Sequence, residues 1–253
     1  MTPSDRPSLP FALPDITDRE VEAVVEVMHS RWLTTGDRAR DFEHQFAAKV
    51  GARHAVALNS CTAALHLALE ALGVRVGDLV YVPTFTFAAT AEVVRYLGAT
   101  PVLVDVDPAT LNMDLDRLEE LVRADLACDR GCPKAVVPVH IAGVSCDMLA
   151  IWDLAREHRL AVVEDAAHAF PASRDGVVTG WMPEDVPGAV CFSFYATKTI
   201  TTGEGGMVTT QSTDLADRIR TMSLHGLSRQ AWKGTLREAV GVTTSSPRAT
   251  STT

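Results

Sequence analysis

Several features are scarce in this sequence, and each shortage excludes a class of protein. No apolar run approaches the ~18 residues that a membrane helix requires, and the N-terminal residues lack the basic start and apolar core of an export signal. The formal net charge is −9, and no cluster of Lys and Arg offsets the acidic surplus. We therefore expect no membrane insertion, no export and no nucleic-acid partner.

Cysteine is too sparse and too scattered to form a disulfide framework. The five cysteines, at positions 61, 128, 132, 146 and 191, are an odd number, which fits a reducing compartment. Cys128 and Cys132 are close enough in sequence to suggest a metal site, but no second pair accompanies them at ligand spacing. We expect a cytoplasmic protein that holds no metal.

The residues that are present indicate one α/β domain. Hydrophobic residues make up 47% of the chain, enough for the core of one sizeable domain. Short runs rich in Val and Ala alternate with helical patterns, which is typical of repeated βα units and a mostly parallel sheet. Strands are expected at 54–58, 79–82, 102–104, 135–139, 160–164, 190–194 and 206–210. Helices are expected at 18–29, 38–50, 62–72, 87–96, 113–126, 147–158 and 214–222.

Lys198 stands in the run FSFYATKTITTGEGGM, residues 192–207, between a short apolar segment and a glycine-rich turn. This setting favours burial and suits a lysine that does covalent chemistry. Thr201 and Thr202 can supply hydroxyls around a phosphate, and the glycines that follow permit close backbone approach. A solvated surface lysine is the alternative. A dinucleotide site is not indicated, because the glycines precede a strand instead of opening a helix.

Asp165 and His168 follow the end of an expected strand in the run LAVVEDAAHAF, residues 160–170. A carboxylate in this apolar setting can keep a pyridine nitrogen protonated, which makes the ring an electron sink. Taken singly, Asp165 can also be a helix cap and His168 a partly buried histidine with its hydrogen bonds satisfied. Lysine, carboxylate and imidazole together point to pyridoxal phosphate.

Two further segments fit the same cofactor. In NSCTAALHLAL, residues 59–69, a strand gives way to a helix whose first N–H groups can bind a phosphate. In VPTFTFAATAEVV, residues 82–94, Phe87 opens a helix at the carboxyl edge of the sheet, where an aromatic ring can stack on a planar ligand. Simple helix capping by Ser60 and Thr62, and core packing of Phe87, are the alternatives.

From Trp32 to Arg229 the chain resembles the DegT/DnrJ/EryC1/StrS family of pyridoxal-phosphate-dependent sugar aminotransferases, because these motifs occur in the family's order. The resemblance implies the large domain of the fold-type I transferases, a mostly parallel seven-stranded sheet with helices on both faces. We expect an N-terminal segment and helix at 1–30, a cofactor-binding large domain at 31–230, and an unrelated polar tail at 231–253 in place of the family's small C-terminal domain.

The resemblance also assigns roles to the motif residues. Lys198 would carry the cofactor as a Schiff base, Asp165 would pair with the pyridine nitrogen, and His168 would face the phenolic oxygen. Phe87 would stack on the ring. Three residues at strand and helix ends would hold the phosphate, namely Cys61, Thr62 and Ser193.

The reaction implied by the resemblance is transamination. An amino donor, typically glutamate in this family, would deliver its amino group by way of the cofactor to a keto group on a nucleotide-linked sugar. Lys198 would hold the cofactor and, once freed, move a proton between substrate and cofactor. A sister branch that dehydrates sugars has histidine in place of this lysine, so Lys198 favours amino transfer. A homodimer is expected for the family but is not carried over to this shortened chain.

The resemblance stops after Trp232. The family continues into a small domain whose asparagine reaches the cofactor phosphate of the neighbouring subunit, whereas this chain ends in a polar tail with the composition of a disordered segment. Restoring one base after the Lys233 codon permits a family-like continuation, so our hypothesis is a single-base deletion that truncates a longer aminotransferase. A natural polar tail is the alternative. A truncated chain would be a non-catalytic remnant that at most binds pyridoxal phosphate or pairs with an intact subunit.

Overall fold

The structure, a computed structural model, describes residues 10, 12–128 and 130–226. The tail expected at 231–253 lies outside these residues, so its composition-based assignment and the frameshift hypothesis stay predictions. No helix among the described residues is long and apolar enough to cross a membrane.

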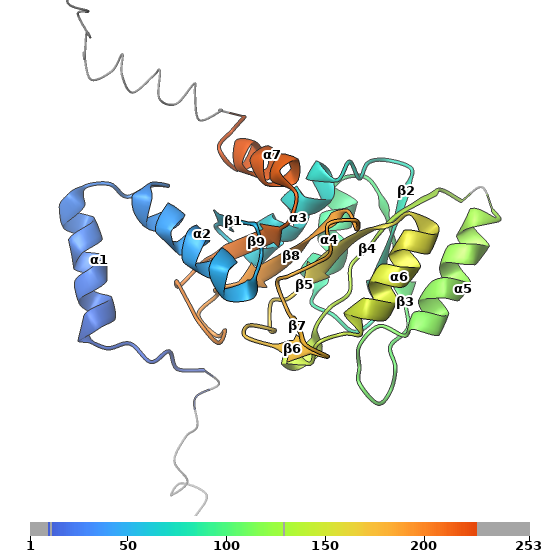
Figure 1. The fold of residues 1–253 in the computed structure, drawn as a ribbon, viewed down its shortest axis with the longest axis horizontal. Coiled ribbons are helices and arrows are strands. Elements are labelled where there is room, and N and C mark those ends of the chain that lie inside the picture. The colour runs from blue at the N-terminus through green and yellow to red at the C-terminus, as the bar shows by residue number, and fades with distance from the viewer. Residues whose placement is uncertain (1–9, 11, 129, 227–253) are drawn as a thin grey trace, which may run out of the picture.

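A seven-stranded sheet forms the centre of the fold, in the order β1-β9-β8-β5-β4-β2-β3 (Figure 1). Its strands are β1 (His54–Leu58), β2 (Asp78–Pro83), β3 (Thr100–Val104), β4 (Cys132–Val136), β5 (Ala161–Asp165), β8 (Gly188–Ser193) and β9 (Gly206–Thr210). All neighbours from β8 to β3 run parallel, whereas β9 is antiparallel to both β8 and β1. The expected mostly parallel sheet of seven strands is confirmed.

Two details of the strands differ from the sequence-based expectation. β4 ends at Val136 instead of Val139, although the chain beyond it still runs beside β5 through an isolated bridge between Val139 and Asp165. A short hairpin of β6 (Ser173–Arg174) and β7 (Val177–Val178) was not expected. Its two-residue loop, Asp175 and Gly176, has positive φ at both positions, the geometry that suits a tight hairpin turn.

The helices begin and end within two residues of the expected bounds. They are α1 (Asp18–Ser30), α2 (Asp37–Val50), α3 (Cys61–Ala71), α4 (Ala88–Tyr96), α5 (Leu115–Leu126), α6 (Met148–His158) and α7 (Thr213–Ser223), with a short 3-10 turn, η2 (Ile141–Gly143). Five helices start at a side-chain cap whose oxygen accepts a backbone N–H, which fixes the first turn. The caps are Thr17, Ser60, Asp114, Asp147 and Ser212.

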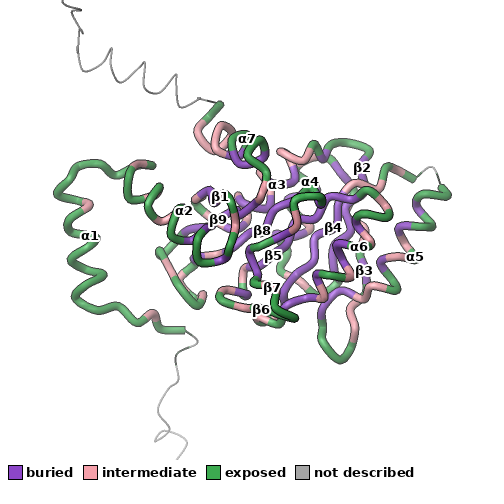
Figure 2. The backbone as a smooth tube through the Cα atoms, viewed as in Figure 1, coloured by how far each residue is buried: buried purple, intermediate pink, exposed green. Residues whose placement is uncertain are grey.

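Helices cover both faces of the sheet, as the resemblance implied. α3, α4 and α7 pack on one face with Val163 of β5, and α5 and α6 pack on the other with Val162. Consecutive strand residues point to opposite faces, so both faces of the inner strands are apolar and buried (Figure 2). α2 covers the remaining part of the second face, whereas α1 buries no residue.

Candidate functional site

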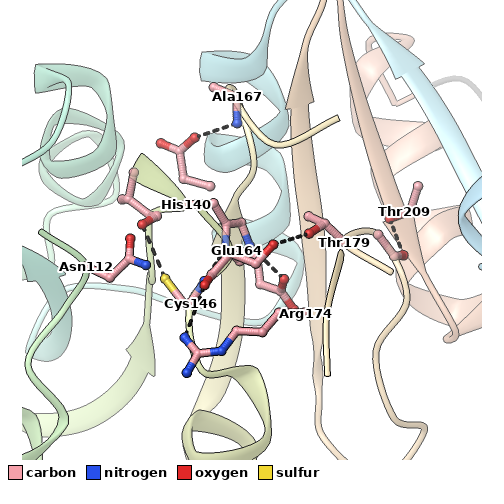
Figure 3. Close-up of polar contacts among 12 residues, drawn as sticks. Asn112, His140, Cys146, Glu164, Ala167, Arg174, Thr179 and Thr209 are labelled. Atoms are coloured by element: carbon pink, nitrogen blue, oxygen red, sulfur yellow. Dashed lines mark hydrogen bonds and ion pairs between the residues drawn. The ribbon is translucent and has the colours of Figure 1, made fainter. Parts of the chain in front are cut away.

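The Asp165 carboxylate is held in a fixed direction at the carboxyl end of β5. The side chain is only 5% exposed. Thr90 of α4 donates its hydroxyl to Oδ2 at 2.8 Å. The amide of Ala167 donates to Oδ1 at 3.2 Å (Figure 3). The Thr86 hydroxyl lies 2.7 Å from that of Thr90 and extends the chain of hydrogen bonds. Asp165 caps no helix, since the residues after it form a turn.

Lys198 and Asp165 both affect the titration of His168 and of Cys61. Partial burial lowers the pKa of His168, the Lys198 ammonium lowers it further, and Asp165 opposes both. Burial raises the pKa of the Cys61 thiol, Asp165 adds to that effect, and Lys198 opposes it. Backbone contacts bring the same elements together: Asp165 is paired with Cys191 of β8, and Gly206, which is paired with Ser193 of β8, packs against Ser60 and Cys61. The roles expected for these residues stay predictions.

The segment that carries Lys198 is fixed by its own hydrogen bonds. Lys198 is half-buried, in a turn where its amide donates to the carbonyl of Tyr195 at 2.9 Å. The Thr201 hydroxyl donates to the Phe194 carbonyl at 2.9 Å, and the Thr202 hydroxyl donates to the Glu204 carbonyl at 2.8 Å. The two hydroxyls expected near a phosphate thus shape the loop between β8 and β9.

The first turn of α3 stands beside this loop at the same edge of the sheet. Ser60 caps the helix by accepting the amide of Ala63 at 3.1 Å, Cys61 is buried and Thr62 is half-buried. The first amides of a helix have no partner within it and carry its positive dipole end, which suits an anion. Gly206 of β9 approaches so closely that an added Cβ would overlap the Ser60 carbonyl and lie 2.7 Å from Cys61 N.

Phe87 and Ser193 complete the set of expected residues. Phe87 is the N-cap residue of α4 and is 78% exposed, so core packing does not explain it. Ser193 is half-buried at the end of β8, where its hydroxyl accepts the amide of Tyr195 at 3.3 Å. His168 is exposed at the surface but is close enough to neighbouring groups for partial burial to lower its pKa.

Sequence reasoning missed two groups beside the site. Thr90 follows Phe87 by three residues, a spacing that places both on one helix face. This spacing could have indicated that Thr90 lies near the site. His140 and Glu164 form a buried pair with 3.0 Å between Nε2 and Oε2. No spacing motif indicates that pair, because Glu164 lies in β5 and His140 lies in the segment between β4 and η2.

One cluster has the composition of a metal site but is held by an arginine. Ligand atoms of Glu119, Glu157 and His158 lie within 4.8 Å of one another between α5 and α6. Arg123 forms ion pairs with both glutamates. We interpret the cluster as an ion-pair network away from the Lys198 site.

Comparisons with known proteins agree with this arrangement. The profile of the DegT/DnrJ/EryC1/StrS aminotransferase family matches residues 14–245. The spore coat polysaccharide biosynthesis protein SpsC of Bacillus subtilis (strain 168) is 49% identical over 224 residues, covering 88% of this chain and 55% of SpsC. The UDP-4-amino-4-deoxy-L-arabinose–oxoglutarate aminotransferase of Shewanella sediminis (strain HAW-EB3) is 40% identical, covering 88% of this chain and 55% of that protein.

Solved structures show the same relationship in three dimensions. Spr1654 from Streptococcus pneumoniae, in its PLP-form, superposes with a TM-score of 0.77 at 32% identity, covering 86% of this chain and 58% of that one. The chain thus spans little more than half the length of the proteins it matches. Family profile, relatives and fold agree over nearly all of the described residues, and the chain belongs to the DegT/DnrJ/EryC1/StrS aminotransferase family.

Proposed function

We propose that the chain is the cofactor-binding part of a pyridoxal-phosphate-dependent aminotransferase that moves an amino group from glutamate to a keto group on a nucleotide-linked sugar. The observation that supports this proposal is that the buried Asp165 carboxylate, the first turn of α3 and the β8–β9 loop that carries Lys198 lie at the same edge of the sheet. The Shewanella relative supports the substrate class, since its name joins a UDP-sugar with oxoglutarate, the keto acid that glutamate becomes on losing its amino group.

The residues at the site fit the chemical parts of pyridoxal phosphate. Lys198 is a half-buried amine, the only group of its kind at this edge among the described residues, and can bind an aldehyde carbon. Asp165 is a buried carboxylate for the pyridine nitrogen. The amides of Cys61 and Thr62, with the Ser193 hydroxyl, suit the phosphate.

Bound pyridoxal phosphate would supply an electron sink that stabilises negative charge on the substrate carbon. Asp165 would hold the proton on the pyridine nitrogen, with Thr90 and Ala167 fixing its two oxygens. Phe87 would cover one face of the ring. Lys198 would move a proton from the carbon of the amino donor to the cofactor, and later from the cofactor to the carbon that receives the amino group.

The first test is whether the 253-residue chain forms the site. Purified chain incubated with pyridoxal phosphate is expected to gain a visible absorbance band that the free cofactor at the same concentration lacks. Lys198→Arg keeps the positive charge but has no amine for covalent attachment, so it is expected to lose the band. Arg at this position giving the same band as Lys198 would contradict the proposed attachment.

The second test separates amino transfer from cofactor binding alone. The alternative function is a non-catalytic remnant that at most binds the cofactor or pairs with an intact subunit. Aminated nucleotide-sugar is measured by mass spectrometry after incubation with glutamate and a nucleotide-linked keto-sugar. We expect weak cofactor retention and little turnover from this chain alone. Robust amino transfer would rule out the remnant.

A further inference from the structure

His140 and Glu164 are two titratable residues in the sheet core that the proposed chemistry does not use. Each is only 1% exposed, and 3.0 Å separates His140 Nε2 from Glu164 Oε2 (Figure 3). A buried pair of this kind is costly, and well-packed apolar side chains usually provide as much stability. Glu164 Oε1 has no hydrogen-bond partner among the described residues, nor has the neighbouring Trp152 Nε1. The pair is therefore poorly explained by stability alone.

The hydrogen bonds of His140 fix where its ring proton lies. Nδ1 of His140 carries no proton, because it accepts the backbone amide of Cys146 at 3.0 Å. The ring proton is then on Nε2, where it is donated to Glu164. The imidazole thus links Glu164 to the backbone at Cys146.

Both backbone groups of Asp165 are bound to the segment that ends at His140. The Asp165 amide donates to the Pro138 carbonyl at 2.8 Å, and the Asp165 carbonyl accepts the His140 amide at 3.1 Å. Glu164 is the residue before Asp165, and successive strand side chains point to opposite faces. Glu164 is therefore hydrogen-bonded to His140 on one face of the sheet. On the other face, the Asp165 carboxylate accepts the hydroxyl of Thr90.

The loop after His140 is hydrogen-bonded to Asn112 and packs against His168. Asn112 donates to the Val144 carbonyl at 3.1 Å and accepts the Ile141 amide at 3.3 Å. An added Cβ on Gly143 would lie 3.1 Å from the His168 carbonyl, so the loop packs directly under that residue. Displacing His140 would therefore disturb the supports of both Asp165 and His168.

We propose that His140 and Glu164 are a positioning pair: their hydrogen bond ties the 138–140 segment to β5 from the far face of the sheet and so sets the direction of the Asp165 carboxylate. Their hydrogen bond lies on the face of β5 opposite the Asp165 carboxylate, so neither residue would touch the cofactor. The inference rests on the proposed function, because the direction of Asp165 matters through its contact with the pyridine nitrogen.

Two substitutions at one position separate the hydrogen bond from the charge. Glu164→Gln keeps an oxygen that accepts from His140 Nε2 but removes the charge. Glu164→Asp keeps the charge, but its shorter side chain cannot reach across the 3.0 Å hydrogen bond. The dissociation constant for pyridoxal phosphate is measured by absorbance titration of the 253-residue chain. We expect about tenfold weaker binding for the Asp variant and a change of less than about twofold for the Gln variant.

Measurements without cofactor show whether an effect is local. Melting temperatures of the two variants are expected to agree within about 5 °C. Amide hydrogen exchange of the peptide covering residues 160–170 is expected to be faster in the Asp variant than in the Gln variant. The proposal would be overturned if the Gln variant lost as much affinity for pyridoxal phosphate as the Asp variant. Equal rates of amide hydrogen exchange in residues 160–170 of the two variants would also overturn it. Absence of cofactor binding by the unsubstituted chain would instead contradict the proposed function, and the exchange comparison would still decide on the pair.

Discussion

Thr90 is the side chain that most directly fixes Asp165. Its hydroxyl donates to Asp165 Oδ2 at 2.8 Å and is 2.7 Å from the Thr86 hydroxyl, so the carboxylate is one end of a short chain of hydrogen bonds. Thr90 is fully buried in α4, beside Val93 and Val94 in sequence. A buried hydroxyl is expected to have a hydrogen-bond partner, because burying it without one costs free energy.

Thr90→Val removes this hydroxyl at nearly constant volume. A hydrogen bond to a charged group contributes about 1.5–3 kcal/mol, so we expect pyridoxal phosphate to bind at least about tenfold more weakly. Thr90→Ser, which keeps the hydroxyl, is the control and should bind within a few-fold of the unsubstituted chain. The dissociation constants are measured by absorbance titration. Equal affinities of the Val and Ser variants would show that the hydroxyl does not support the site.

His168 gives the site a pH dependence whose sign follows from its environment. Burial and Lys198 lower the pKa of His168 in the folded chain, so the unfolded chain binds the proton more readily. Its contribution to stability is therefore present above its ordinary pKa of about 6.5 and is lost as the pH falls below that value through the lower pKa of the folded chain. We expect His168→Gln to be less sensitive to a change from pH 7.5 to 5.5, measured as the shift in urea midpoint. The same shift in both proteins would contradict this environment for His168.

At the scale of elements, β9 and the first turn of α3 approach closely at Gly206. An added Cβ would overlap the Ser60 carbonyl, and backbone atoms on both sides leave little room to move. We expect Gly206→Ala to lower the free energy of unfolding by about 1–3 kcal/mol. Gly203→Ala is the control. Gly203 has φ of +81°, and a Cβ added there would meet no atom within 4 Å. The substitution should therefore lower the free energy of unfolding by only about 1 kcal/mol, through backbone strain. Urea unfolding measures the free energy of unfolding of the two variants. A smaller decrease for Gly206→Ala than for Gly203→Ala would contradict the close approach of β9 to α3.

α1 is the element that contributes least to the core. None of its residues is buried, and its ion pair between Glu26 and Arg38 is exposed on both sides. Exposed ion pairs contribute about 0–1 kcal/mol. We therefore expect deletion of residues 1–30 to change the free energy of unfolding by no more than about 1 kcal/mol, measured in urea. A loss of several kcal/mol would mean that α1 packs against the domain in solution.

The elements themselves were predictable because each is marked locally. Short Val- and Ala-rich runs predicted all seven strands of the sheet, and caps such as Ser60 and Asp147 mark where helices begin. The antiparallel direction of β9 was not predictable from such runs, since a buried strand has the same apolar pattern in either direction. The β6–β7 hairpin was missed because two-residue strands are too short to show an alternating pattern.

The site was predictable only as far as its motifs extend. Lys198, Asp165, His168 and Cys61 lie in recognisable runs, and the fold places them at one edge of the sheet. The contact of Thr90 with Asp165 joins residues 75 positions apart, and no local pattern contains that information. The fold had to bring α4 against β5 before this support could be recognised.

For the molecule as a whole, the structure describes one α/β body that carries the expected site residues along the carboxyl edge of its sheet. The family relationship covers nearly all of the chain but little more than half of its relatives. Assembly of the cofactor site and completion of the reaction are therefore separate questions, and covalent attachment of the cofactor at Lys198 addresses the first.

Reduction with borohydride followed by peptide mass spectrometry tests this claim most directly. The sequence has four lysines, at positions 49, 134, 198 and 233, so an attached cofactor can be assigned without ambiguity. The purified chain is incubated with pyridoxal phosphate, reduced and digested. We predict that the peptide containing Lys198 gains the mass of the reduced cofactor and that the other three lysines stay unmodified. No adduct at Lys198, or modification spread evenly over the four lysines, would contradict the account.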